Sequence, residues 1–550
     1  MKTIEIKFPN GTTKTVDYGT KTIELLDNFE EGDSEIIAVR VNNEISSLTE
    51  QLIYNSYLEP VYLNTTEGAQ VYRRTLCFVL AAAANDIFPN SRLLVGHSLG
   101  RGYYYTLETG KPLKQVDIDS LSKKMHSLIN ENLPITQTVI SYKDAIELFE
   151  KTNLVESRKQ IEYICPSYFV MNVLGDFADL YHGPFLSSTG ILTQFDLTKY
   201  GDGFLLRFPH SLDHSKLTDF KDIPKLFNIY NEYKKWGKML NLTSSASLNE
   251  RIYKREIKEL INIIEHLQTK QIADIADQIK NRGNVKVVLI AGPSSSGKTT
   301  TSKKLSVQLQ VLGFNPKVIE LDTYYVGREK TPKNENGDYD YECLEALDVA
   351  QLNKDLVDLF AGKEVNLPSY DFIEGKRFYT NKKMKLETND ILILEGIHGL
   401  NDNLTPLIPK DIKFKIYLSA LTQLNLDDHT RIATSDNRLI RRIVRDSQFR
   451  GKSAKDTIKM WPNVQNGEKL YIFPYQNQAD AMLNTALDYE LAVLKVYAEP
   501  LLKAVKPFDA EYSEAKRLLS FLNNFLPIPV TDVPVQSLLR EFIGGSDFKY

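Results

Sequence analysis

The strongest constraint on this chain is a glycine-rich loop that joins an apolar strand to a helix. Residues 285–290 form a short run rich in β-branched side chains, which is typical of a buried parallel strand. The run leads into Gly292-x-x-x-x-Gly297-Lys298-Thr299, and helical spacing follows. In this context the loop N–H groups wrap a polyphosphate, Lys298 reaches the β- and γ-phosphates, and Thr299 holds Mg²⁺. The sequence predicts a nucleoside triphosphate site formed by Gly292, Pro293, Ser294, Ser295, Ser296, Gly297, Lys298, Thr299 and Thr300.

The length of the chain indicates several domains, and its net charge gives no overall electrostatic attraction to nucleic acid or membranes. The 550 residues allow three or four domains of about 150 residues each, and the formal net charge is −4. The cysteines, Cys77, Cys165 and Cys343, are far apart and favour a reducing compartment. The N-terminus has no signal-peptide core, and the best apolar run, residues 76–84, has roughly half the length that spans a bilayer. We therefore expect a cytoplasmic protein with no membrane partner.

Residues 1–66 have the pattern of a small β-grasp domain. Apolar and polar residues alternate over residues 4–8, and an Asn-Gly pair at Asn10 predicts a hairpin turn. Further strands are expected at residues 13–16 and 36–41. The segment resembles the TGS-type domain at the N-terminus of threonyl-tRNA synthetase.

The following residues carry a second set of motifs, which begins with two arginines before an apolar helix. In chain order the motifs are Arg73-Arg74-Thr75-Leu76, Phe88-Pro89, Leu94-Val95-Gly96-His97, Gly102-Tyr103-Tyr104-Tyr105 and Leu180-Tyr181-His182-Gly183-Pro184-Phe185. They resemble the second additional, or editing, domain shared by threonyl- and alanyl-tRNA synthetases, and the resemblance extends to about residue 215.

The editing chemistry does not carry over with the resemblance. That family uses a His-x-x-x-His pair and a Cys-x-x-x-His pair, and the matching positions here are Phe78, Ala82, Tyr181 and Phe185. Phenylalanine and alanine offer no lone pair for a metal or for general base catalysis. We expect an editing-like fold without its hydrolytic site, in which His97 and His182 have structural roles.

Acidic residues end two further predicted strands near the glycine-rich loop. A strand at residues 316–321 is followed by Asp322, and a buried strand at residues 391–397 carries Glu395 in a Walker-B-like position. A carboxylate at the tip of a strand beside the loop faces the ligand crevice of an open α/β sheet. Asp322 can there accept a proton from a hydroxyl or help to position Mg²⁺.

The C-terminal half resembles the uridine kinase and phosphoribulokinase family over about residues 283–510. The motifs that carry the resemblance are the glycine-rich loop, Asp322-Thr323-Tyr324-Tyr325, Tyr370-Asp371-Phe372, Leu394-Glu395-Gly396-Ile397 and the basic helix with Arg438, Arg441, Arg442 and Arg445. The whole arrangement resembles bacterial uridine-kinase-related proteins that join this kinase to a synthetase-like N-terminus.

The resemblance implies a role for each matching residue, with ATP and Mg²⁺ as cofactors. Asp322 would be the base toward a nucleoside 5′-hydroxyl, Tyr325 and Tyr370 would flank the base, and Glu395 would join Thr299 at the metal. Glu342 would hold the ribose, and Arg377 and Arg438 would contact the acceptor. An arginine lid would close over the phosphates, with Lys298, Arg441 and Arg445 as catalytic cations and Arg442 on ATP.

Two departures from the family pattern leave the acceptor open. The pyrimidine-reading histidine of the family falls at Gly375, and the ribose position carries Glu342 in place of the usual aspartate. A glycine has no side chain to read a base edge, so discrimination between bases should be weak. Uridine is the default acceptor, and a sugar phosphate is the alternative.

A nucleotide-gated regulator that binds tRNA-like RNA is an alternative from a different class of function. The near-neutral charge favours little RNA binding. A trans-editing deacylase is disfavoured by the four replaced residues, and nothing resembles the aminoacylation core of a working synthetase. Neither the number of subunits nor the role of the C-terminal extension follows from the sequence.

The predicted fold is therefore an α/β multidomain chain with a parallel sheet in its P-loop domain. The expected parts are a TGS-like β-grasp domain at residues 1–66, an α+β editing-like domain at 67–218, a helical connector at 219–282, a P-loop kinase-like domain at 283–510 and a C-terminal extension at 511–550.

Overall fold

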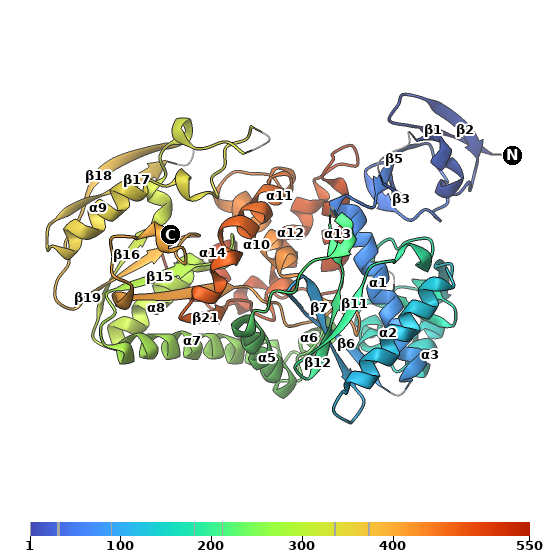
Figure 1. Cartoon of the computed structure of the whole chain (residues 1–550), viewed down its shortest axis with the longest axis horizontal. Helices are drawn as coiled ribbons and strands as arrows, with labels where there is room; N and C mark the ends of the chain where they lie inside the picture. The colour runs from blue at the N-terminus through green and yellow to red at the C-terminus, as the bar shows by residue number, and fades with distance from the viewer. Residues whose placement is uncertain are drawn as a thin grey trace. The chain divides into compact units, whose positions relative to one another are not determined.

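The chain folds into two compact units (Figure 1). The computed structural model describes residues 2–29, 34–89, 91–180, 182–211, 213–334, 337–371 and 374–549. The first unit comprises Met1–Arg255, Gln423–Ala433 and Ala498–Pro527, and the second comprises Glu256–Thr422, Thr434–Tyr497 and Ile528–Tyr550. Each unit has sheets and apolar clusters of its own.

The N-terminal part of the first unit is a five-stranded mixed sheet with the order β2-β1-β5-β3-β4. Its elements are β1 (Thr3–Lys7), β2 (Thr13–Asp17), the 3₁₀ helix η1 (Thr22–Asn28), β3 (Ile36–Val41), β4 (Glu44–Ser46) and β5 (Ser56–Tyr62). The predicted hairpin is confirmed, because β1 pairs antiparallel with β2 and Ile4 lies opposite Val16. The central strand β5, which runs parallel to β1, adds to the strands expected from the sequence.

The rest of the first unit contains three antiparallel sheets, β11-β12-β7-β6, β10-β9-β8 and the two-stranded β13-β14, and the helices around them. The strands are β6 (Arg92–Leu99), β7 (Gly102–Glu108), β8 (Thr136–Ser141), β9 (Tyr168–Leu174), β10 (Phe177–Leu180), β11 (Asp196–Tyr200), β12 (Gly203–Arg207), β13 (Pro209–His210) and β14 (Asp213–Leu217). The helices are α1 (Thr66–Ile87), α2 (Gln115–Asn130), α3 (Tyr142–Lys151), α4 (Val155–Ile164), α5 (Pro224–Met239), α6 (Ser245–Tyr253) and α13 (Tyr512–Leu522).

An apolar cluster occupies the positions that carry hydrolytic side chains in editing domains. The Phe78 ring centroid lies 4.9 Å from that of Phe185 and 5.4 Å from that of Phe177. Ala82 is buried beside them, and Tyr181 lies outside the described residues. Because tightly packed rings leave no polar donor for metal or water, these positions support the core.

His97 and His182, which the sequence predicts to be structural, are both within hydrogen-bonding distance of an oxygen atom. The Nδ1 atom of His97 lies 2.6 Å from the Ser98 carbonyl oxygen, and burial lowers the pKa of His97 to about 3. The Nε2 atom of His182 lies 2.6 Å from Asp427 Oδ2.

The second unit is built on a five-stranded parallel sheet with the order β16-β19-β15-β20-β21, which confirms the predicted fold class. The strands are β15 (Val287–Ala291), β16 (Asn315–Glu320), β19 (Asp390–Glu395), β20 (Lys413–Ser419) and β21 (Ala481–Asn484), with a separate hairpin of β17 (Val365–Asp371) and β18 (Lys376–Met384). Every residue of β15, β19 and β20 is buried, as the continuous apolar runs predict.

Helices flank this sheet, and α8 begins directly after the loop at the carboxyl end of β15 (Figure 1). They are α7 (Ile257–Arg282), α8 (Lys298–Val311), α9 (Val349–Phe360), α10 (Thr434–Phe449), α11 (Ala454–Tyr471), α12 (Glu490–Lys503) and the short α14 (Arg540–Ile543). Helices α7 and α8 lie side by side, and α10 packs against both α11 and α14. This arrangement brings the basic helix α10 to the loop between β15 and α8.

Candidate active site

The predicted phosphate loop connects the buried strand β15 to helix α8. Gly297 is the N-cap of α8 and has φ +79°, a left-handed conformation that glycine adopts at little cost. The Lys298 ammonium donates to the carbonyl oxygen of Pro293 at 3.3 Å, so it lies folded back over the loop. The first amides of α8 have no partner within the helix, which makes this end suited to an anion.

Two arginines of α10 hold the loop through its carbonyl oxygens. Arg438 donates to Ser294 O at 3.1 Å, and Arg441 donates to Ser295 O at 3.2 Å. Arg441 also donates to Thr485 O at 2.8 Å, next to the end of β21. These bonds fix the path of the loop from the side of α10.

Both loop-holding arginines are buried in ion pairs, which differs from the mobile lid expected from the sequence. Arg438 pairs with Glu468 of α11, with Nη2 and Oε2 2.7 Å apart. Arg441, at 0% exposure, pairs with Glu490 of α12, with Nε and Oε2 3.0 Å apart. An arginine whose guanidinium is bound to a buried carboxylate and to the loop backbone is a positioning residue. The expected contact of Arg438 with the acceptor and the expected catalytic role of Arg441 stay predictions, and in this structure both side chains hold the loop.

The next arginines along α10 lie around Asp446, beside the phosphate loop and near Asp322. We call this space between the loop and Asp322 the crevice. Arg442 Nη1 donates to the Ser294 hydroxyl at 2.9 Å, and Arg445 Nη2 lies 3.0 Å from Asp446 Oδ1. Arg450, just after α10, joins them, and burial together with the neighbouring Arg445 lowers its pKa to about 10. These three side chains concentrate positive charge beside the loop.

Asp322 lies in the short 3₁₀ helix that directly follows β16. Burial raises the pKa of its carboxyl, while Lys298, Arg450 and Arg445 are near enough to oppose that rise. The structure therefore brings together the carboxylate at the strand tip, the loop lysine and the crevice arginines. This is the juxtaposition that a proton acceptor beside a phosphate site requires.

Thr299 and Glu395 form the donor set that fits Mg²⁺. The Thr299 hydroxyl donates to Glu395 Oε2 at 3.3 Å. Burial raises the pKa of Glu395 to about 8, although Lys298 opposes the rise, and the nearby carboxylates of Asp322, Glu320 and Glu541 add to it. Hydroxyl and carboxylate oxygens are the ligands that this hard cation prefers, and a cation would stabilise the ionised form of Glu395.

Glu395 gives the free energy of unfolding a pH dependence. Its pKa is about 8 in the folded chain and ordinarily 4.5. Between these values the folded chain holds a proton that the unfolded chain has lost, so stability from this group falls as the pH rises. We expect the urea midpoint of the parent to fall more steeply between pH 5 and about 8 than that of Glu395→Gln, which cannot ionise. Equal slopes in the two proteins would contradict this assignment.

Aromatic side chains line the region next to Asp322 where the acceptor was expected. The ring centroids of Tyr325 and Tyr370 are 5.4 Å apart, and Tyr325 donates from its hydroxyl to Tyr341 O at 3.2 Å. Burial raises the pKa of Glu342 to about 7, even with Arg442 nearby. Tyr325, Tyr370 and Glu342 thus come from separate segments to one region of the second unit.

Arg377 and Gly375 each contact another segment of the second unit, and their roles at the acceptor stay predictions. Arg377 Nη1 lies 2.8 Å from Asp348 Oδ2, and Asp348 caps α9, so this arginine joins the β17–β18 hairpin to that helix. Gly375 has φ +70°, and a Cβ there would lie 2.8 Å from Arg328 Nε. The guanidinium of Arg328 therefore lies over the position of the base-reading histidine.

Several residues of the site could not be found from motifs. Glu468 and Glu490 lie in segments with no recognisable chemistry. Glu541, in the C-terminal extension, accepts hydrogen bonds from Thr300. Arg450, by contrast, continues the cluster of basic residues on α10 and can be expected from the sequence.

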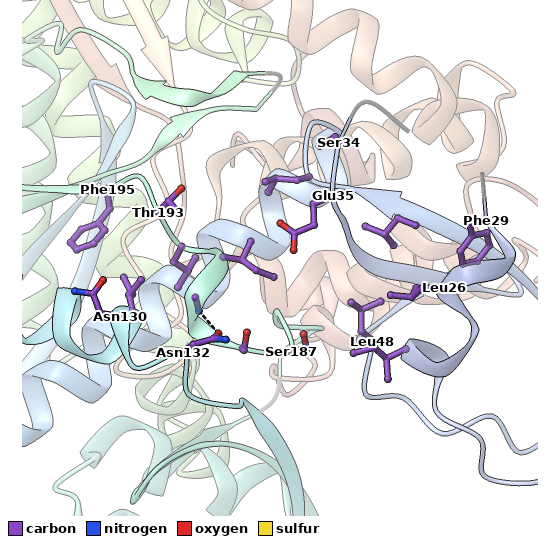
Figure 2. Close-up of a pocket in the computed structure, with 18 of the residues that line it drawn as sticks. Leu26, Phe29, Ser34, Glu35, Leu48, Asn130, Asn132, Ser187, Thr193 and Phe195 are labelled. Atoms are coloured by element: carbon purple, nitrogen blue, oxygen red, sulfur yellow. Dashed lines mark hydrogen bonds between the residues drawn. The ribbon is translucent and has the colours of Figure 1, made fainter. Parts of the chain in front are cut away.

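A separate cavity of about 1420 Å³ lies in the first unit, between the N-terminal five-stranded sheet with η1 and helix α2 (Figure 2). Leu26, Phe29 and Leu48 line one side, and Asn130 and Phe195 line the other. None of the nucleotide or acceptor residues predicted from the sequence lies in its lining.

Comparisons with known sequences match the two halves of the chain to different proteins. Residues 287–492 match the sequence model of the phosphoribulokinase / uridine kinase family. Threonine–tRNA ligase from Desulforamulus reducens is 30% identical over 197 residues, which are 35% of this chain and 31% of that protein. Threonine–tRNA ligase 2 from Bacillus subtilis is 30% identical over 208 residues, which are 37% of this chain and 32% of that protein. The N-terminal region is the part that matches these ligases, and the chain spans about a third of their length.

Two solved kinase structures have partial similarity to the chain. A "possible uridine kinase from Bacillus stearothermophilus" is 20% identical and covers 39% of this chain and 98% of its own, with a TM-score of 0.25. D-glycerate 3-kinase from Cryptococcus neoformans is 16% identical and covers 46% of this chain and 87% of its own, with a TM-score of 0.22. The family match at residues 287–492 supports a phosphotransferase of the kinase type.

Among the described residues, no helix is both long and apolar enough to cross a membrane.

Proposed function

Because residues 287–492 match the phosphoribulokinase / uridine kinase family, we propose that the chain transfers the γ-phosphoryl group of ATP to a nucleoside 5′-hydroxyl. The observation that carries this proposal is the placement of Asp322 near Lys298, Arg445 and Arg450. A carboxylate held beside a phosphate loop and its cations can receive the proton that an attacking hydroxyl loses.

Some residues of the site would bind and neutralise the phosphates, and Asp322 would accept the proton. The loop amides and Lys298 bind the phosphates, and Arg442 and Arg445 offset the negative charge that grows during transfer. Asp322 accepts the hydroxyl proton at a carboxylate oxygen, and burial makes it a stronger base than an exposed aspartate. Mg²⁺, when bound by Thr299 and Glu395, supplies positive charge beside the phosphates.

The acceptor site supports a nucleoside with little discrimination between bases. Tyr325 and Tyr370 offer aromatic faces for a base, and Glu342 offers an acceptor for ribose hydroxyls. Gly375 has no side chain to hydrogen-bond a base edge, so turnover should differ by no more than about 10²-fold among nucleosides.

A sugar phosphate is the second candidate, and the position of Arg328 favours it. Its guanidinium lies over Gly375, where an anionic group of the acceptor could be held.

A panel of uridine, cytidine, adenosine, guanosine and ribulose 5-phosphate separates these two acceptors. ADP formation with each acceptor is the readout. We expect turnover with the nucleosides. Turnover with ribulose 5-phosphate alone would show that the acceptor is a sugar phosphate and not a nucleoside. ATP binding without turnover of any of the five compounds would contradict the kinase proposal.

Binding of tRNA-like RNA by the N-terminal region is a separate proposal, supported by the matches to threonine–tRNA ligases. The net charge of −4 leads us to expect weak binding. A filter-binding assay with tRNA, with and without ATP, measures it.

A further inference from the structure

The C-terminal segment of residues 528–549 packs directly on the phosphate loop. A Cβ placed on Gly297 would lie 2.7 Å from Leu538 Cδ1, so the leucine side chain fills the space beside this glycine. The ring of Phe542 lies with its centroid 5.0 Å from the Arg441 guanidinium carbon. Leu538, Leu539 and Phe542 are all at 0% exposure, so the segment is firmly anchored.

Within this anchored segment, Glu541 directs a carboxylate at the start of helix α8. Its Oε2 atom accepts hydrogen bonds from Thr300 N at 3.1 Å and from Thr300 Oγ1 at 2.7 Å. Thr300 lies in the first turn of α8, where backbone N–H groups have no partner within the helix. Such amides and the helix dipole favour an anion, and Glu541 is the anion in this structure.

The sequence predicts Thr300 as a nucleotide-binding residue, so the two anions would share one position. Thr300 is at 0% exposure and its amide is already bonded to Glu541. Glu395 also lies near Glu541, and Lys303 is the cation near both. Lys298 and Lys303 would attract phosphate oxygens brought to this turn, but the Glu541 carboxylate already holds the Thr300 groups and would repel those oxygens while it stays in place.

We propose that Glu541 is an internal competitor of the nucleotide phosphates at the first turn of α8. The inference rests on the proposed nucleotide binding and adds a regulatory contact to it. The apolar anchors Leu538 and Phe542 stay buried, whereas Glu541 is partly exposed and can turn away without undocking the segment. Nucleotide binding then includes the cost of releasing the Glu541–Thr300 contact.

Calorimetric titration of the full chain with ADP tests this competition, because ADP binding requires no acceptor. Glu541→Gln keeps the shape of the side chain and removes its charge. We expect it to bind ADP about tenfold more tightly, a ratio that one charge-assisted hydrogen bond can supply. Asp547→Asn is the matched control, since Asp547 is an exposed acid of the same segment. We expect its affinity to stay within about twofold of the parent.

The possible results separate competition by Glu541 from an effect of net charge and from a failure of nucleotide binding. Equal or weaker ADP binding by Glu541→Gln would overturn the competition and leave the kinase proposal standing. Equal tightening in Asp547→Asn would also overturn it, because net charge alone would then explain the gain. Absence of ADP binding in all proteins would overturn both proposals. If Glu541→Gln does not fold, Glu541→Asp keeps the charge but is too short to reach both Thr300 groups, and we expect tighter binding there too.

Discussion

Asp322→Asn should lower turnover with the best nucleoside by about 10²- to 10⁴-fold, the range that a positioned general base supplies. Asparagine keeps the size of the side chain but cannot accept the hydroxyl proton. The affinity for ATP should change little, because the loop and its arginines are untouched. Steady-state kinetics for turnover and calorimetry for ATP binding measure the two effects separately.

A matched substitution controls for general effects of removing a carboxylate from this domain. Asp358 lies on α9 and pairs with Lys363, 2.6 Å away, outside the crevice. Asp358→Asn should therefore retain the parent turnover. Turnover of Asp322→Asn at the parent rate would show that the base assignment is wrong.

Arg441→Met should lower the free energy of unfolding of the second unit by about 3–5 kcal/mol. The substitution fills similar space but leaves Glu490 as an unpaired buried charge, and it removes the bonds to the carbonyl oxygens of Ser295 and Thr485. Chemical denaturation followed by tryptophan fluorescence measures the change. The chain has two tryptophans, and Trp236→Phe leaves Trp461 of α11 as the reporter near α10.

Two comparisons separate the loss of this ion pair from other effects of the substitution. Arg445→Met should cost less than about 1 kcal/mol, because Asp446 keeps its contact with Arg442. Adding Glu490→Gln to Arg441→Met should recover part of the loss, since the unpaired charge is then removed. Equal stability of Arg441→Met and the parent would show that the pair does not hold the loop.

The elements that carry the candidate site follow from local sequence patterns. An apolar run, a glycine loop and helical spacing fix β15, the phosphate loop and α8 within a few neighbouring residues. Asp322 follows its strand directly, so its place at the edge of the sheet needs only the knowledge that the sheet is parallel.

The ion pairs of the site arginines could not be predicted, because their partners are distant in the sequence. Arg438 and Arg441 have the spacing of an exposed basic stripe, but Glu468 and Glu490 pair with them from α11 and α12. Arg377 pairs with Asp348 for the same reason. Periodicity reports which face of an element a side chain occupies, and it carries no information about a carboxylate that lies 29 to 49 residues away.

In the N-terminal half, local patterns and residue types predict several features of the fold. Its hairpin and the strand at residues 36–41 follow the predicted patterns. The apolar cluster around Phe78 and Phe185 follows from residue type alone, because two aromatic side chains at such positions pack together.

Phosphoryl transfer from a triphosphate on the loop to an alcohol near Asp322 is the central step of the proposed function. A single-turnover reaction with γ-labelled ATP and uridine, followed by ³¹P NMR and mass spectrometry of the products, tests this step. We predict that the label appears as the 5′-monophosphate of the nucleoside, together with ADP. Label that appears only as inorganic phosphate, or that stays in ATP, would contradict the account.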